Sequence, residues 1–308
     1  MPLAPEYVAM FEQLAQQEPA PSLWEMTPEQ GREMYRAMRP VIEELPAHKI
    51  ENRTIPGSQA DIPVRIYTPE GEGPFGVLVY FHGGGWVIGD CDVCDAACRE
   101  ISTLANLVVV SVDYRMAPED VYPASVVDAY DATSWAASNM AELNGNGKLG
   151  VTGESAGGNL SAVVSLKARD EGGPDIAFQC LLYPVVDSSM TQGSYEENGE
   201  GYILEVPAMK WFWDHYCPNV EQRKEPYAAP LLADDLTNLP KALIVTAEFD
   251  PLRDEGEAYA DALTAAGNDA KAVRYDGMVH DFFATAPLFE SARHGFLETI
   301  EAFKANLN

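Results

Sequence analysis

One short segment of the sequence carries a residue pattern suited to nucleophilic chemistry. Residues 153–157 read Gly-Glu-Ser-Ala-Gly and stand between an apolar run and a stretch with helical character. A serine on a sharp strand-to-helix turn exposes its hydroxyl, and flanking glycines avoid collisions with neighbouring backbone. The helix start also directs backbone N–H groups and a positive dipole end at the reacting oxygen. We therefore expect Ser155 to be a nucleophile, supported by Gly153, Glu154 and Gly157.

A run of three glycines supplies a second part of the same chemistry. Residues 82–86 read His-Gly-Gly-Gly-Trp and directly follow an apolar run. Bare glycine N–H groups let a substrate approach closely, as stabilising a tetrahedral oxyanion requires, and losing one such donor costs roughly 3–4 kcal/mol of barrier. A phosphate-binding glycine loop is the alternative, but no Lys follows the glycines as it does in nucleotide-binding loops. We expect His82 to support the shape of this loop.

A serine hydroxyl needs a base within hydrogen-bond reach, and histidine is the usual one. The five histidines of the chain are His48, His82, His215, His280 and His294. His215 lies in an aromatic segment and His294 in a late, charged helix. A histidine in a loop is in general a solvated surface residue. His280, however, stands just past an apolar run, after both the serine and a suitable acid, so we expect it to be the base.

The acid that orients this histidine should follow a strand and precede His280 in the chain. Asp250 stands at the carboxyl end of an apolar run, before a proline that forces a turn. In this place it would hold the imidazole in the correct tautomer and stabilise the imidazolium. Asp254 and Glu248 are competitors, whereas Asp281 is too close to His280 in sequence to be a natural partner. We favour Asp250.

The elements that must position these residues alternate between strands and helices. Continuous apolar runs at 77–81 and 107–112 are typical of strands buried on both faces of a sheet. Further strands are expected at 149–152, 180–183, 242–246 and 272–275, an antiparallel pair at 53–55 and 64–67, and helices at about 91–105, 124–141 and 156–170. This alternation predicts an α/β fold with a mostly parallel central sheet and helices on both faces.

Two segments outside this rhythm, the N-terminal residues 1–45 and an insertion at 187–225, are expected to form a lid over the sheet. Residues 188–201 are polar and turn-rich, and residues 208–216 read as a short aromatic helix. The predicted division is N-terminal cap helices at 1–45, an inserted cap segment at 187–225, and a catalytic domain at 46–186 and 226–308. The side chains expected to line an apolar acyl pocket are Trp24, Met34, Met38, Trp86, Tyr183, Trp211, Phe212 and Phe282. The alternative for the aromatic helix is plain core.

Taken together, the motifs resemble the hormone-sensitive-lipase-like branch of the α/β-hydrolases, the bacterial family IV esterases. The matching segments are HGGGW at 82–86, DYRMAPE at 113–119, GESAGG at 153–158, Tyr-Pro at 183–184, DPLRD at 250–254 and GMVH at 277–280. They stand in the family's order between about residues 70 and 290. The resemblance implies an α/β-hydrolase fold with a helical cap made of the N-terminal and inserted segments.

The resemblance also implies roles for individual residues. Ser155, Asp250 and His280 would form a catalytic triad. The oxyanion hole would come from the N–H groups of Gly84, Gly85 and Ala156, with Gly83 shaping the loop. Members usually carry Asp or Thr at the position of Glu154, a departure that leaves the nucleophile intact.

Composition excludes several classes of function. The chain has 48 acidic and 20 basic residues, a formal net charge of −28, and such a surface repels nucleic acid and anionic membranes. The charge is typical either of a well-hydrated cytoplasmic enzyme or of adaptation to salty surroundings. No apolar window reaches the length of a membrane span, and the N-terminus lacks a secretory signal, so we expect a cytoplasmic protein without stable membrane association.

The expected mechanism requires no cofactor and no metal, and the cysteines do not have the spacing of a metal site. Cys91, Cys94 and Cys98 are close in sequence, but no second pair of ligands follows to complete a zinc site. Free, mostly buried thiols fit these cysteines better.

The strand at 272–275 could lie at a sheet edge and pair with a second subunit in a homodimer.

The sequence therefore predicts a carboxylesterase that hydrolyses short- to medium-chain acyl esters through a serine acyl-enzyme. An amidase or deacetylase acting on aryl amides with the same triad is the close alternative. A catalytically silent, ligand-binding member of the fold is a more distant one, since serine, acid and histidine are all present.

Overall fold

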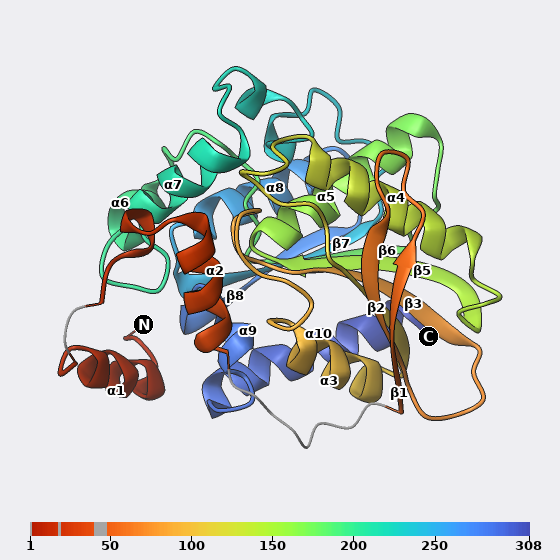
Figure 1. Cartoon of the computed structure of the whole chain (residues 1–308), viewed down its shortest axis with the longest axis horizontal. Helices are drawn as coiled ribbons and strands as arrows, with labels where there is room; N and C mark the ends of the chain where they lie inside the picture. Colours follow the sequence, from red (N-terminus) through yellow and green to blue (C-terminus); the bar gives the residue numbers. More distant parts are fainter. Residues whose placement is uncertain (1, 18–19, 40–47) are drawn as a thin grey trace.

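The computed structural model describes residues 2–17, 20–39 and 48–308, and its centre is a single eight-stranded sheet (Figure 1). The strands are β1 (Lys49–Ile55), β2 (Ile62–Thr68), β3 (Phe75–Phe81), β4 (Leu107–Val112), β5 (Gly145–Glu154), β6 (Phe178–Leu182), β7 (Lys241–Phe249) and β8 (Ala270–Val279). Their order across the sheet is β1-β2-β4-β3-β5-β6-β7-β8. β2 pairs antiparallel with β1 and β4, and the other neighbours are parallel. The predicted mostly parallel sheet is confirmed.

Helices cover both faces of this sheet. They are α1 (Pro5–Leu14), α2 (Pro28–Ala37), α3 (Asp95–Ala105), α4 (Ala124–Ser138), α5 (Ala156–Glu171), α6 (Gly193–Asn198), α7 (Val206–Tyr216), α8 (Arg253–Ala265), α9 (Phe282–Thr285) and α10 (Glu290–Leu307). In Figure 1, α4, α5 and α8 lie above the sheet, and α3 and α10 lie below it. Every residue of β3 and β4 is therefore buried, as their continuous apolar sequences predict.

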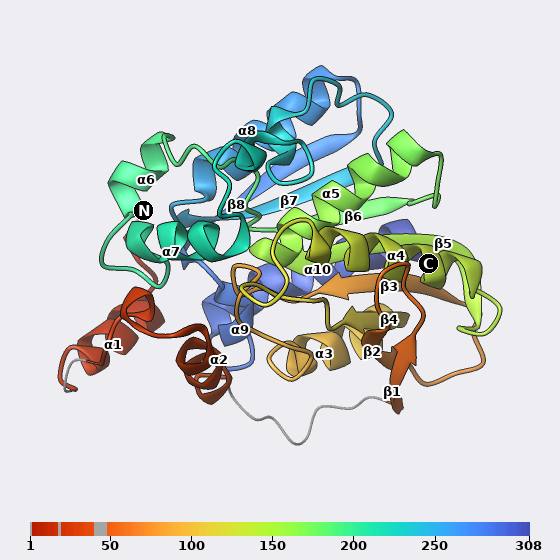
Figure 2. The ribbon, with the colours of Figure 1, turned by 45° about the horizontal axis from the view of Figure 1, so that its top comes forward.

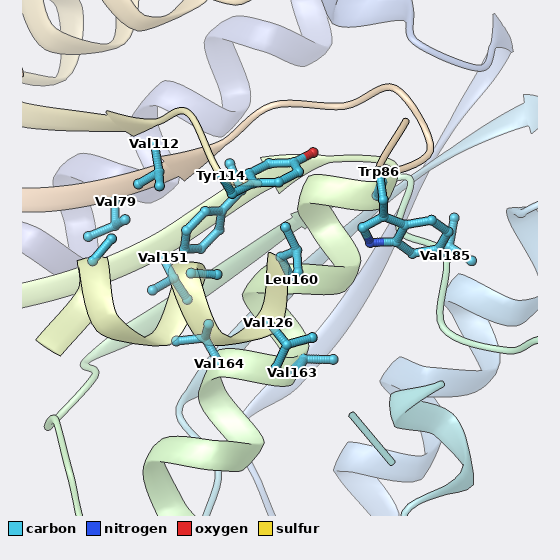
Figure 3. Close-up of a cluster of buried hydrophobic side chains, with 14 of the residues drawn as sticks. Val79, Trp86, Val112, Tyr114, Val126, Val151, Leu160, Val163, Val164 and Val185 are labelled. Atoms are coloured by element: carbon cyan, nitrogen blue, oxygen red, sulfur yellow. The ribbon is translucent and has the colours of Figure 1, made fainter. Parts of the chain in front are cut away.

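The hydrophobic core on the upper face joins the central strands to two helices. Figure 3 shows Val79 of β3 and Val151 of β5 facing Val126 of α4 and Leu160 and Val164 of α5. These branched side chains are almost fully removed from water. The burial of α5 matters most for the site, because this helix begins directly after Ser155.

The segments predicted to form a lid gather at one end of the sheet (Figure 2). α1 and α2 come from the N-terminus, and α6 and α7 come from the insertion after β6. The polar, turn-rich stretch at 188–201 contains α6, a helix that its local sequence did not indicate. Ser194 explains the difference: it is fully buried, and its hydroxyl donates to the carbonyl of Pro251 at 2.6 Å. This tertiary contact overrides the polar, turn-rich local sequence. Residues 40–45 of the predicted N-terminal cap lie outside the described residues.

Other helix boundaries also differ from the sequence expectation. The helix expected from about residue 91 begins only at Asp95, and the one expected to reach 141 ends at Ser138. Within α3, Leu104 is 36% exposed, whereas Ala105 beside it is fully buried. All five cysteines are free and buried.

Among the helices that the structure describes, none is both long enough and apolar enough to cross a membrane. Nor, over the same residues, do three or more His, Cys, Asp or Glu side chains converge in a way that could hold a metal ion.

Candidate active site

Ser155 occupies the sharp turn between β5 and α5. Its backbone φ is 54°, a positive value that is uncommon for a residue other than glycine. The turn packs directly on the end of β3: a Cβ added to Gly157 would lie 1.9 Å from the carbonyl oxygen of Phe81. A side chain at this position would therefore force the two segments apart. Gly153 is equally confined, because a Cβ added there would lie 2.4 Å from the same oxygen.

A hydrogen-bond relay joins Ser155 to the two residues expected to act with it. His280, just past β8, lies with Nε2 3.1 Å from Ser155 Oγ and with Nδ1 2.7 Å from Asp250 Oδ2, just past β7. Asp250 is fully buried, and 7% of His280 is exposed. The competing acids face elsewhere: Asp254 accepts from Arg253 and from the Ser194 N–H. The geometry thus brings together the three residues that the sequence singled out.

Charges around the relay set the proton affinity of His280. Burial alone would lower the pKa of this imidazole, but the carboxylates of Asp250, Asp281 and Glu154 outweigh burial and raise it above its usual value. With Asp250 at Nδ1, the neutral ring carries its proton on that nitrogen and leaves Nε2 free to accept from Ser155.

The glycine run forms a tight turn beside Ser155. Gly84 has φ 109°, and a Cβ on it would lie 2.1 Å from the carbonyl oxygen of Ile88, so only glycine fits. Neither the Gly84 nor the Gly85 N–H donates a hydrogen bond within the part of the chain that the structure describes. Both residues, with Gly83, line the cavity that contains Ser155. Ala156 is the first residue of α5, where the N–H has no partner inside the helix, although its side chain is buried and does not line the cavity.

His82 lies behind the glycine turn. It is fully buried, stacks on Tyr114 with 4.3 Å between ring centroids, and has Nδ1 2.8 Å from the carbonyl oxygen of Gly83. Burial lowers the pKa of His82 to about 4, so the ring is neutral near pH 7. The Tyr114 hydroxyl donates to the His82 carbonyl at 2.8 Å. These contacts fix the turn from the side away from the cavity.

The cavity above Ser155 has a volume of about 760 Å³ and lies under the lid helices. Of the side chains expected to line an acyl pocket, five do so: Trp24, Met34, Met38, Trp86 and Phe212. Residues of α1 and of the loop before α10 also line it, namely Tyr7, Met10, Leu14, Leu288 and Phe289. The helical spacing of Tyr7, Met10 and Leu14 is the signal that could have assigned α1 to the cavity.

Three expected pocket residues do not line the cavity. Tyr183 and Phe282 are buried in the core on the lower side of the sheet, with 5.6 Å between their ring centroids, and Tyr183 packs against the edge of His280. Trp211 lies on α7 next to Phe212, but its ring packs on Gly31 of α2 and on His215. Neighbouring positions on a helix point in directions about 100° apart, so only Phe212 of this pair reaches the cavity.

A further group of charged residues lies around the relay, in which Glu154, expected to support the nucleophile, is joined by Asp281 and Arg39, which were not expected there. Asp281 accepts a hydrogen bond from Arg39, which follows α2, at 2.7 Å. Glu154 is 4% exposed, and burial followed by the charge of Asp281 raises its pKa to about 7. Arg39 carried no motif in the sequence, and only the fold brings it to this position.

The family assignment follows from comparison with known proteins. A family model described as the alpha/beta hydrolase fold matches residues 78–284. The chain belongs to this family. Its glycine run and serine turn place it in the hormone-sensitive-lipase-like branch that the sequence resembles.

Relatives of this α/β-hydrolase span most of its length. It is 43% identical over 283 residues to the carboxylic ester hydrolase LipN of Mycobacterium tuberculosis, covering 88% of this chain and 75% of LipN. A hyperthermophilic esterase from the archaeon Pyrobaculum calidifontis superposes with a TM-score of 0.92 at 40% identity, over 99% of both chains. A thermostable esterase from Pseudomonas putida ECU1011 gives a TM-score of 0.95 at 38% identity, over 100% of this chain and 98% of that one.

Proposed function

We propose that this α/β-hydrolase is a serine carboxylesterase acting on esters of short to medium acyl chains. The observation that carries the proposal is the relay from Ser155 through His280 to Asp250 at the floor of an apolar cavity. The names of its relatives, which are ester hydrolases and esterases, support the same reaction class.

In the proposed mechanism, His280 Nε2 takes the proton of the Ser155 hydroxyl as its oxygen attacks the ester carbonyl. The free N–H groups of Gly84 and Gly85, with that of Ala156, receive the oxyanion. The imidazolium, stabilised by Asp250, returns the proton to the departing alcohol. Water then attacks the acyl-enzyme with His280 again as base, releasing the carboxylic acid and restoring Ser155.

The proposed acyl preference rests on the shape and lining of the cavity. Its volume of about 760 Å³ lies within the range of small-molecule sites, and apolar side chains, several of them methionine or aromatic, form most of its wall. Helices α1, α2 and α7 cover the cavity, which favours a substrate dissolved in water over one in an emulsified lipid. This supports the proposed division into a lid, residues 1–45 and 187–225, and a catalytic domain.

Two experiments test the function. Ser155→Ala should abolish hydrolysis of p-nitrophenyl butyrate while the melting temperature stays close to that of the wild type, and substantial residual turnover would refute the assignment. A series of p-nitrophenyl esters should then give highest kcat/KM at short or medium chains; an optimum at C12 or beyond contradicts the acyl preference. Aryl amides included in the screen decide between esterase and amidase.

We also propose a homodimer formed through β8. This strand is at an edge of the eight-stranded sheet, where a second strand could pair with its outer backbone groups before Gly277, whose own N–H and carbonyl are bonded to Glu248 and Ala4. Size-exclusion chromatography coupled to light scattering should then give twice the mass of the chain, and a monomer at micromolar concentration refutes it.

A further inference from the structure

Arg39 reaches from the N-terminal segment to the loop that carries His280. Its Nη2 lies 2.7 Å from Asp281 Oδ2, and only 12% and 18% of the two side chains are exposed. The Tyr35 hydroxyl accepts from the same guanidinium group, whose Cζ lies 4.3 Å from the centroid of the Tyr35 ring. On the other side, the Tyr183 hydroxyl donates to Asp281 Oδ1 at 3.5 Å. Asp281 is thus held from two directions.

The backbone of Asp281 makes this hold relevant to His280. Asp281 directly follows His280 and adopts φ 63°, a left-handed conformation that needs compensation from its surroundings when the residue is not glycine. His280 must face Ser155 and Asp250 at the same time. Because the Asp281 side chain is fixed, the backbone turn at Asp281 holds the His280 ring where it contacts both Ser155 and Asp250.

Arg39 also acts on the residue before the nucleophile. Glu154 immediately precedes Ser155, and the positive charge of Arg39 opposes the burial and the Asp281 charge that raise its pKa. Arg39 and Glu154 line a second cavity of about 710 Å³, and Arg39 lines the substrate cavity as well. The guanidinium therefore stands where the two cavities meet, close to the chain neighbours of both Ser155 and His280.

The tyrosine, cysteine and histidine side chains buried beside this cluster are neutral near pH 7, whereas the other charged groups that line the second cavity are held in ion pairs, namely Arg36, Arg65, Asp92, Asp95, Arg99 and Glu100. Burial raises the pKa of four tyrosines and one thiol, those of Tyr7, Tyr35, Tyr80, Tyr183 and Cys98. Burial lowers the pKa of His82, on the glycine turn, to about 4. The charge balance around His280 therefore depends on Arg39, Asp281, Glu154 and the Asp250 partner.

We propose that Arg39 is a positioning residue for the hydrolytic site, an inference that rests on the proposed function. It holds Asp281, and through it the loop of His280, and it balances the two carboxylates that adjoin the relay in the chain. The N-terminal segment then does more than cover the cavity: its docked position delivers a cation that the relay requires.

The test compares Arg39→Met with Arg36→Gln, both assayed with p-nitrophenyl acetate. Arg36 lies in the last turn of α2, three residues before Arg39, and pairs with Asp90, but its side chain is 53% exposed and contacts no neighbour of the relay. Misplacing a catalytic group by about 1 Å can cost about 100-fold in rate, so we expect kcat of Arg39→Met to fall by about 10- to 100-fold with little change in KM. Arg36→Gln should keep the wild-type kcat.

The pH profile separates positioning from simple loss of stability. Below about pH 7 Glu154 is mostly protonated with or without Arg39, because its pKa is about 7. Removing the Arg39 cation therefore leaves the negative charge of Asp281 unbalanced, and the pKa of His280 rises. Because the neutral ring is the base, the acid limb of kcat/KM should move to higher pH in Arg39→Met. In Arg39→Met with Asp281→Asn, both charges are gone, and the acid limb should return toward the wild-type position.

Further variants keep the proposal testable if Arg39→Met does not fold, as judged by near-UV circular dichroism. Arg39→Lys keeps the charge, so its acid limb should stay in place while kcat falls, and Asp281→Asn alone should move the acid limb to lower pH. Wild-type kcat with an unmoved acid limb in Arg39→Met overturns the role of Arg39. If Arg39→Met does not fold, wild-type kcat in Arg39→Lys together with an unmoved acid limb in Asp281→Asn overturns it. Loss of activity in Ser155→Ala in the same series leaves the proposed function standing, whereas residual hydrolysis there refutes that function instead.

Discussion

Replacing Asp250 with asparagine changes the relay without changing its volume. Oδ2 of Asp250 lies 2.7 Å from His280 Nδ1, and Oδ1 accepts from the Leu252 N–H at 2.9 Å. An asparagine that keeps its oxygen on Leu252 presents its NH₂ group to Nδ1, so His280 is driven into the tautomer with the proton on Nε2. In that tautomer the ring can no longer accept the proton of Ser155.

The size of the effect follows from the tautomer. The corresponding change in a serine-protease triad lowers kcat about 10⁴-fold, which at 1.36 kcal/mol per tenfold is about 5.4 kcal/mol of barrier. KM should change little, because Asp250 does not line the substrate cavity. Burial lowers the pKa of His280 and the charge of Asp250 raises it, so removing that charge lowers the pKa. The acid limb of the residual activity should then move to lower pH.

The assay is the steady-state release of p-nitrophenol from p-nitrophenyl butyrate between pH 5 and 9. Asp254→Asn is the matched control: this acid stands four residues later and pairs with Arg253 rather than with His280. We expect the control to keep kcat within about tenfold of the wild type. A larger loss in Asp254→Asn than in Asp250→Asn, or a loss below tenfold in Asp250→Asn, would refute the assigned role.

Three other predictions concern the glycine turn, a buried carboxyl group and the surface charge. Gly84→Ala places a Cβ against the Ile88 carbonyl and so displaces the proposed oxyanion donors. It should lower kcat by about 100-fold or more and leave KM nearly unchanged, which steady-state kinetics can check. Burial raises the pKa of Glu255 to about 8, so folding favours its protonated form. Between about pH 5 and 8 the melting temperature of the wild type should therefore fall with rising pH more steeply than that of Glu255→Gln. Equal slopes for the two proteins contradict this prediction. Because the chain has a net charge of −28, salt should screen its self-repulsion, and the melting temperature should rise from low to molar NaCl. A flat or falling melting curve against NaCl concentration removes salt adaptation as an explanation of the charge.

The sequence was sufficient to predict the features that depend on local pattern. The strand at 107–112 has the predicted bounds, and Ser155, Asp250 and His280 follow β5, β7 and β8. Strand ends of a parallel sheet meet at one edge, so the order of these motifs along the chain already placed them near each other.

Features set by long-range packing could not be predicted in the same way. Phe282 was expected to line the acyl pocket, but it packs beneath the relay with Tyr183. α6 forms in a polar stretch because Ser194 and Tyr195 are buried against the loop and helix that follow β7. Arg39 reaches Asp281 across 242 residues of sequence, and no periodicity or motif reports a contact of that kind.

The close packing of Gly157 on Phe81 links the two motifs of the site into one unit. Phe81 is the last residue of β3 and directly precedes the glycine turn, so any displacement of its carbonyl also moves the donors proposed for the oxyanion. Substitutions in the serine turn and in the glycine turn are therefore not independent, and their effects on kcat should not add. An attempt to transplant or redesign either turn succeeds only if both are exchanged together.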